Sequence, residues 1–266
     1  MSDPVLYEVN EHIATITLNR PERMNTISGD MLDMLTDYLL KADADKDVRC
    51  IILTGTGRAF CAGLDLGEAT RHKDGATGIA SGAVTQTTIN LKHTPPTALY
   101  NMDTPTICAL NGSAAGYGMD TALGCDIRIM AESAKMAAAF TKRGIVPESG
   151  GTWFLPRLLG WSKAAQLIFT GRTLKAKECL EMGLVSEVVG DNELPERARA
   201  VAKEIAANAP MAVQSSKRMM RMGMEETFDT HVQHVFLQLL PLLRSADARE
   251  GMLAFMEKRE PKFEGR

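Results

Sequence analysis

The chain contains the stretch Asn111-Gly112-Ser113-Ala114-Ala115-Gly116-Tyr117-Gly118-Met119-Asp120, which decides the fold. It follows an apolar run at residues 106–110 that is typical of a buried strand, and most of its residues are small. Small residues at the carboxyl end of a strand let a ligand approach the main chain, and N–H groups at a following helix start can point at negative charge. The stretch therefore predicts a strand, a ligand-binding turn and a helix that begins near Gly116. Tight packing alone would also explain the same residues.

A second stretch has a similar composition and follows another strand. It reads Ala59-Phe60-Cys61-Ala62-Gly63-Leu64-Asp65-Leu66, and the apolar run before it, at residues 50–54, is closed by Gly55 and Gly57. Open α/β folds bind their ligands outside the carboxyl ends of their parallel strands. We therefore expect the two turns to lie together, with main-chain N–H groups arranged as an oxyanion hole.

The first 160 residues alternate strands and helices. Residues 13–18 have the period of a strand, and residues 126–130 are predicted to form one more strand. From Met31 the apolar residues repeat at helical spacing, and Ser28 is a suitable N-cap. This order predicts an α/β fold with a mostly parallel sheet that is buried on both faces.

Beyond Ser162 the pattern becomes helical. We expect helices over residues 162–169, 175–182, 193–208, 211–223, 228–243 and 247–258, with one short strand over residues 184–189. This tail indicates a helical appendage that covers a neighbouring chain.

Composition narrows the class of protein. Of the 266 residues, 45% are hydrophobic and 24% are charged, and the formal net charge is -3. These values are ordinary for a folded globular protein and argue against a nucleic-acid partner. Because the N-terminus lacks a secretory pattern and no apolar stretch is long enough to cross a membrane, we expect a cytoplasmic protein with no membrane partner. The five cysteines are widely spaced, so we expect reduced thiols.

Several familiar motifs do not occur. Gly55-Thr56-Gly57 and Gly116-Tyr117-Gly118 both lack the third glycine of a dinucleotide-binding fingerprint. The P-loop and the H-E-x-x-H zinc motif are missing from the sequence. Only His231 and His234 have a spacing that could serve a metal, and surface or packing roles suit them better, so no metal site is expected.

Three segments of the sequence resemble a known family. Ile16-Thr17-Leu18-Asn19-Arg20-Pro21, residues 59–66 and residues 111–126 resemble the crotonase (enoyl-CoA hydratase/isomerase) superfamily in order and spacing. The likeness runs from about residue 5 to Phe263. It implies a crotonase-like ββα spiral core with a C-terminal helical trimerisation region. We expect an acyl-CoA-binding core over residues 1–200 and an oligomerisation region over residues 201–266.

The resemblance also implies the ligand and its contacts. Members of this superfamily bind coenzyme A in a bent shape as part of an acyl-CoA substrate, with no prosthetic group, and form homotrimers or dimers of trimers. Their two oxyanion donors correspond to the backbone N–H groups of Leu64 and Tyr117. The expected coenzyme contacts are Arg23, Met24, Ala62, Asp65 and Leu66, joined by Lys258 and Phe263 from a neighbouring subunit.

The acid and base positions depart from the hydratase pattern. Hydratases of this superfamily activate water with two glutamates, whose positions fall here on Asp120 and Phe140, and a phenyl ring cannot transfer protons. Residues 143–157 are similar to members, including double-bond isomerases, whose catalytic carboxylate corresponds to Glu148. We therefore expect Glu148 to be the acid/base, assisted by Asp120. Desolvation beside Phe140 and the aromatic residues 153 and 154 should raise the pKa of Glu148.

Simpler interpretations of both acids stay open. Glu148 could be an acid favoured by the dipole of a helix at residues 149–155, and Asp120 could merely belong to the helix after Gly118. The expected function is an enoyl-CoA hydratase or isomerase of fatty-acid or related acid catabolism. An acyl-CoA hydrolase or lyase of the same fold, or a non-catalytic CoA-binding scaffold, is the alternative.

Overall fold

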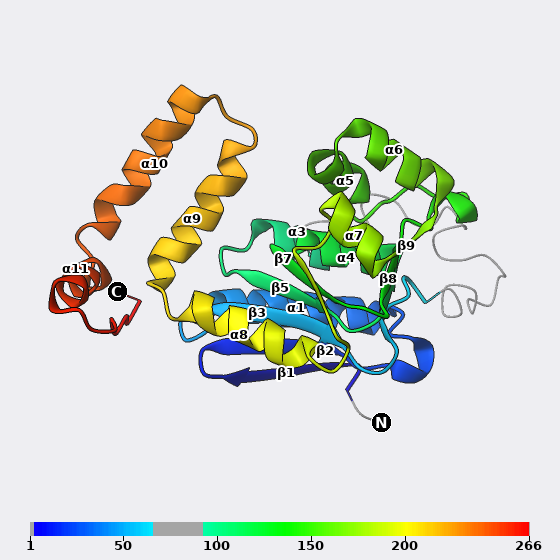
Figure 1. The fold of residues 1–266 in the computed structure, drawn as a ribbon, viewed down its shortest axis with the longest axis horizontal. Helices are drawn as coiled ribbons and strands as arrows, with labels where there is room; N and C mark the ends of the chain where they lie inside the picture. The colour runs from blue at the N-terminus through cyan, green and yellow to red at the C-terminus, as the bar shows by residue number, and fades with distance from the viewer. Residues whose placement is uncertain (1–2, 66–92, 266) are drawn as a thin grey trace.

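The structure is a computed structural model and describes residues 3–65 and 93–265. Within these residues, a six-stranded sheet has the order β1-β2-β3-β5-β7-β10 (Figure 1). All neighbouring strands are parallel except β1 and β2, which are antiparallel, so the predicted mostly parallel sheet is confirmed. The strands are β1 (Val5–Asn10), β2 (Ile13–Leu18), β3 (Cys50–Gly55), β5 (Thr106–Leu110), β7 (Ile127–Ala131) and β10 (Glu187–Val189).

A second, smaller sheet makes the chain a spiral. Its strands are β4 (Ala59–Cys61), β6 (Ser113–Ala115), β8 (Lys135–Ala137) and β9 (Thr173–Lys175). The chain passes from β3 to β4, from β5 to β6 and from β7 to β8, so a long strand is followed each time by a short one. This repeated step confirms the expected ββα spiral. The sequence does not predict the short strands, because three residues are too few to show a period.

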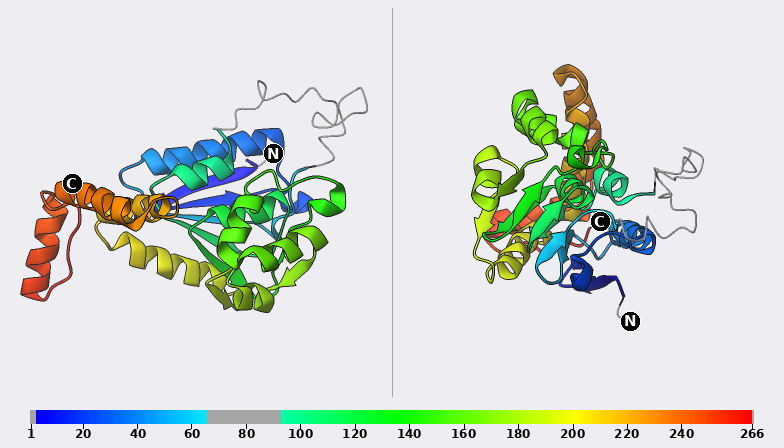
Figure 2. Two further views of the ribbon diagram at one scale, coloured as in Figure 1. Left: turned by 90° about the horizontal axis from the view of Figure 1, so that it is seen from above. Right: turned by 90° about the vertical axis from the view of Figure 1, so that its right-hand side faces the viewer.

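Helices cover both faces of the large sheet. Helices α1 (Gly29–Ala44) and α3 (Pro95–Asn101) lie on one face and α8 (Leu194–Ala206) on the other (Figure 2). The predicted cap of α1 is confirmed, because the Met31 N–H donates to Ser28 Oγ at 3.3 Å. The other helical segments of the body are α4 (Tyr117–Gly124), α5 (Gly151–Leu159), α6 (Trp161–Thr170), α7 (Ala176–Met182), η1 (Pro21–Arg23) and η2 (Thr141–Arg143).

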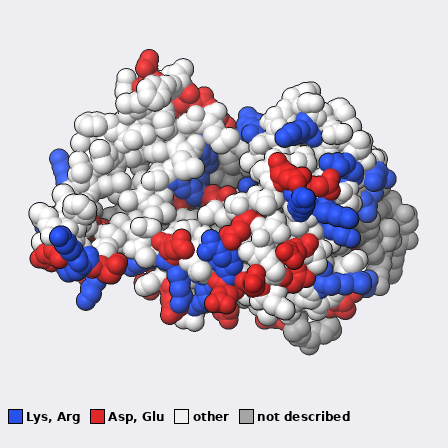
Figure 3. Space-filling model, viewed as in Figure 1, with Lys and Arg blue, Asp and Glu red and all other residues white. Residues whose placement is uncertain are grey.

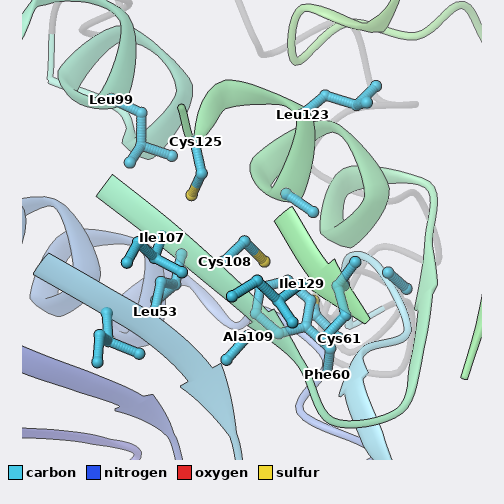
Figure 4. Close-up of a cluster of buried hydrophobic side chains, with 14 of the residues drawn as sticks. Leu53, Phe60, Cys61, Leu99, Ile107, Cys108, Ala109, Leu123, Cys125 and Ile129 are labelled. Atoms are coloured by element: carbon cyan, nitrogen blue, oxygen red, sulfur yellow. The ribbon is translucent and has the colours of Figure 1, made fainter. Parts of the chain in front are cut away.

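The interior is apolar and contains the cysteines. In Figure 4, Leu53, Ile107 and Ile129 of the large sheet lie in one cluster with Phe60 of the small sheet. All five cysteines are buried and free, as the sequence predicts. Burial raises the pKa of the Cys61 thiol to about 12, so this thiol stays protonated and unreactive at neutral pH.

Three C-terminal helices extend away from the α/β body (Figures 1 and 2). We call this part the C-terminal arm; it consists of α9 (Pro210–Gly223), α10 (Phe228–Leu242) and α11 (Ala246–Glu257). Ion pairs hold its base to the body, where Lys217 pairs with Asp126 at 2.8 Å and Arg221 with Asp103 at 3.2 Å. The expected boundary at residue 200 falls inside α8, which packs on the large sheet. The division of roles between the two parts stays a prediction.

Candidate active site

The two small-residue stretches meet at the carboxyl ends of the strands. Gly63 has a φ of +106°, and a Cβ built on it would lie 3.1 Å from the Ala115 carbonyl oxygen. Glycine therefore permits both the backbone conformation and the close approach of the two segments. The expectation that these turns lie together is confirmed.

The hydrogen bonds around Leu64 leave its N–H without an acceptor in the described part of the chain. The Ile27 N–H donates to the Gly63 carbonyl at 2.8 Å, and the Asp65 N–H donates to the Ile27 carbonyl at 2.9 Å. In this parallel bridge the groups of residues 63 and 65 face Ile27, so the Leu64 N–H points to the opposite side. It has no acceptor among the residues that the structure describes.

The position of Tyr117 at the start of a helix determines where its N–H points. Tyr117 is the first residue of α4, and the first N–H groups of a helix have no acceptor within the helix. The preceding Gly116 has a φ of +54° and donates its own N–H to the Ala137 carbonyl at 3.0 Å. Residues 3–65 and 93–265 offer the Tyr117 N–H no acceptor.

A pocket of about 480 Å³, including the part that opens to solvent, lies at this junction. It is lined by residues of both stretches, by Glu148, and by η2 with the residues around it. The lining residues are Ala62, Gly63, Leu64, Ala115, Gly116, Tyr117, Ala139, Phe140, Arg143, Ile145 and Glu148. Leu64, Tyr117 and Glu148 thus come from three separate segments and share one cavity.

Glu148 lies on the loop between η2 and α5. The pKa of its carboxyl is raised by desolvation, although much of the side chain is exposed at the open side of the pocket. This direction is the one that the sequence predicts, but the aromatic surroundings differ. Phe140 lines the pocket, whereas the Trp153 ring packs edge-on against Phe154 and Tyr100, outside the lining. Helix α5 begins only at Gly151, so Glu148 precedes its first turn.

Asp120 is close to this loop but does not line the pocket. Its side chain is 1% exposed, and its Oδ2 accepts hydrogen bonds from the Ser149 hydroxyl at 2.8 Å and from the Gly151 N–H at 2.9 Å. Burial raises the pKa of Asp120 to about 7, while these two hydrogen bonds act in the opposite direction. Asp120 therefore contacts the segment that follows Glu148 and not the pocket itself.

Most of the expected coenzyme contacts gather at one rim. The Ala62 N–H donates to the Met24 carbonyl at 3.1 Å, which brings exposed residues Arg23 and Met24 beside the first stretch. The Asp65 carboxylate is buried and pairs with Arg20 at 3.1 Å, so its side chain is engaged within the protein. Leu66 lies outside the described residues.

Lys258 and Phe263 are not brought to this rim within one chain. The Phe263 carbonyl accepts a hydrogen bond from Arg49 at 2.7 Å, and Arg49 immediately precedes β3. The pocket lies beyond the carboxyl ends of the strands, at the opposite end of β3. Lys258 ends α11 in the C-terminal arm, on the far side of the body from α5 (Figure 1).

Some residues that shape the site carry little signal in the sequence. Asn25 is fully buried with a φ of +54°, and its amide group donates to the Thr56 and Ala59 carbonyls at 2.9 and 2.8 Å. Its preference for the left-handed region is the only signal that could have indicated this role. Arg143 and Ile145 line the pocket from η2 and the loop after it, where no period marks them.

Residues 3–65 and 93–265 contain no group of three or more His, Cys, Asp or Glu side chains placed to hold a metal ion. No described helix is both long and apolar enough to cross a membrane.

Comparison with known proteins agrees with this geometry. The family model for enoyl-CoA hydratase/isomerase matches residues 8–266. The chain is 38% identical to the 1,2-epoxyphenylacetyl-CoA isomerase of Escherichia coli (strain K12) over 100% of both proteins. It is 35% identical to the short-chain-enoyl-CoA hydratase of Clostridium acetobutylicum, over 98% of this chain and 97% of that protein. The chain belongs to the enoyl-CoA hydratase/isomerase family.

A solved structure supports the same assignment for the fold. The crystal structure of an enoyl-CoA hydratase from Bacillus anthracis matches with a TM-score of 0.89 and 34% identity, over 99% of this chain and 100% of that one. The resemblance to the crotonase superfamily is thereby confirmed. This member of the enoyl-CoA hydratase/isomerase family is an enzyme of that type, and the family acts on thioesters of coenzyme A.

Proposed function

We propose that this enzyme moves a proton between carbon atoms of an acyl-CoA thioester through an enolate intermediate. The Glu148 carboxylate takes a proton from a carbon next to, or conjugated with, the thioester carbonyl. The electron pair of the broken C–H bond moves toward the carbonyl oxygen, which becomes an oxyanion. The protonated Glu148 then returns the proton to another carbon, so no water or redox partner is consumed.

The proposal rests on one pocket that brings together an acid and two residues, Leu64 and Tyr117, whose main-chain N–H groups have no acceptor among residues 3–65 and 93–265. The N–H groups of Leu64 and Tyr117 belong to the backbone, so the oxyanion hole does not depend on side-chain identity. Loss of one such donor typically lowers kcat by about 100- to 1000-fold. The raised pKa of Glu148 brings it nearer to neutral pH, where a general acid/base is most effective.

Phe140 favours isomerisation over hydration. Among the described residues that line the pocket, Glu148 is the only carboxylic acid, and Phe140 occupies the wall where the family pattern predicts a second one. Activation of water by two acids would need a second acid, and the described lining residues do not supply one. A double-bond shift needs only one group that first accepts a proton and then returns it.

The function is tested with a 3-enoyl-CoA and with crotonyl-CoA as substrates. We expect conversion of the 3-enoyl-CoA to its conjugated 2-enoyl isomer. The ultraviolet absorbance of the conjugated thioester monitors this reaction. Glu148→Gln should lower kcat by about 100- to 10,000-fold with little change in the Kd for acyl-CoA, because general acid/base catalysis has this magnitude.

Other products would indicate a different activity of the same fold. Release of free coenzyme A from these substrates would indicate a hydrolase, and formation of a 3-hydroxyacyl-CoA would indicate a hydratase. If wild type and Glu148→Gln bind acyl-CoA equally and neither converts any substrate, the proposed chemistry is wrong.

We further propose that the C-terminal arm assembles the enzyme, as a homotrimer or a dimer of trimers. Helix α10 buries none of its residues within the chain, although it carries Phe228, Phe236 and Leu237 with exposed fractions of 78%, 57% and 61%. Phe255 of α11 is 85% exposed. Figure 3 shows that the surface over α9 and α10 is largely uncharged. An apolar face of this extent is expected to be covered by another molecule.

The same assembly would give Lys258 and Phe263 their expected role. Within one chain both residues lie at the end of the body opposite the pocket. Contact with coenzyme A therefore requires the ligand of a second copy. A cytoplasmic location stays a prediction.

A further inference from the structure

Asp120 is placed where it can act only through its neighbours. It is 1% exposed, and it accepts hydrogen bonds from the Ser149 hydroxyl and the Gly151 N–H, which belong to the three residues after Glu148. The donors approach the same oxygen, Oδ2, at 2.8 and 2.9 Å. The carboxylate therefore holds the segment that carries the proposed acid/base.

The backbone around this carboxylate has little freedom. Gly150 has a φ of +111°, which side-chain-bearing residues rarely adopt. A Cβ built on Gly151 would lie 2.9 Å from Asp120 Oδ2 and 3.0 Å from its Cγ, closer than ordinary carbon contacts. The loop can thus lie directly against Asp120 only because residue 151 is glycine.

Asp120 also shares a helix with an oxyanion donor. Helix α4 begins at Tyr117, whose N–H is one of the two donors, and Asp120 lies in the first turn of the same helix. The Asp120 N–H donates to the Gly116 carbonyl at 3.1 Å and so closes this turn. One rigid helical turn therefore carries both an oxyanion donor and the anchor of Glu148.

We infer that Asp120 is a positioning residue that fixes the Glu148 carboxylate relative to the oxyanion hole, and that it does not itself touch the substrate. This differs from the catalytic assistance that the sequence predicts for Asp120. The inference rests on the proposed function and deepens it. Displacement of a reacting group by about 1 Å can lower the rate by about 100-fold. Loss of the two hydrogen bonds to Asp120, which hold the segment after Glu148, should therefore lower kcat.

Three variants separate positioning from proton transfer. Asp120→Asn keeps an acceptor oxygen of nearly the same shape but cannot ionise, Asp120→Ala removes the acceptor, and Ser149→Ala removes one donor. We expect kcat within about tenfold of wild type for Asp120→Asn and about 100-fold lower for Asp120→Ala, with KM little changed in both. Ser149→Ala should fall between them. When Glu148 is already Gln, Asp120→Ala should lower kcat no further.

If Asp120→Ala folds, either of two results would overturn the inference. The first is an Asp120→Asn variant that is folded, by circular dichroism and melting temperature, and yet as slow as Asp120→Ala, which would make the carboxylate a participant in proton transfer. The second is a full loss of kcat on Asp120→Ala in the Glu148→Gln background. Should Asp120→Ala not fold, an unchanged kcat for Ser149→Ala also contradicts the inference. The proposed function fails separately, if Glu148→Gln is as active as wild type.

Discussion

Gly118 allows the two segments of the oxyanion hole to approach each other, and Gly118→Ala tests that approach. It is the second residue of α4, directly after Tyr117, and its Cα faces Cys61 at the end of β4. A Cβ built on Gly118 would lie 2.6 Å from the Cys61 Cβ and 2.8 Å from its carbonyl carbon. One methyl group therefore forces apart the helix with the Tyr117 N–H and the strand that leads to Leu64.

The size of the effect follows from these distances. Carbon atoms make favourable contact at about 3.5–4.0 Å, so the two backbones must separate by about 1 Å. Overpacking of this kind costs about 1–3 kcal/mol of folding free energy, partly offset by the helix preference of Ala over Gly of about 1 kcal/mol. A donor displaced by about 1 Å lowers kcat by about 100-fold.

Gly29→Ala is the matched control. Gly29 is the first residue of α1, and a Cβ built on it meets no atom within 4 Å. The control should be neutral or stabilised by up to about 1 kcal/mol and should keep full activity. Urea unfolding and steady-state kinetics on a 3-enoyl-CoA would compare the two variants. If Gly118→Ala matched Gly29→Ala in both stability and kcat, the close approach would not be what builds the oxyanion hole.

Two further predictions concern pH and assembly. Burial raises the pKa of Asp120 from 3.8 to about 7, so the folded chain binds a proton that the unfolded chain releases, and stability falls as pH rises from about 4 to 7. Between pH 5 and pH 8 about two of these pKa units are crossed, so at about 1.4 kcal/mol per unit wild type should lose up to about 3 kcal/mol relative to Asp120→Asn in urea unfolding; parallel curves would contradict this. Phe236→Glu should reduce the mass of the particle in light scattering toward the 28.9 kDa of one chain. The control Phe169→Glu changes an equally apolar, 72% exposed residue on α6 and should leave the oligomer intact; loss of mass in both variants, or in neither, argues against the arm as the interface.

Much of the fold follows from local patterns. The predicted strand at residues 106–110 coincides with β5, and the Ser28 cap and the C-terminal helices lie where the periodicity indicates them. These elements are long or strongly patterned, so each carries its own signal. The three-residue strands of the second sheet depend on contacts between segments that are distant in the sequence, which local periods do not record.

The sequence by itself determined the glycines at positions 63, 116 and 118, the acid at 148 and the phenyl ring at 140, and hence the chemical groups available to the site. Only the tertiary structure decided which of these groups share a cavity. It joined Leu64, Tyr117 and Glu148 and turned Asp120 away from the pocket toward Ser149 and Gly151. The physical reason is that residue types are fixed locally, whereas the direction of an N–H or a carboxylate is set by the partners that its neighbours find across the fold.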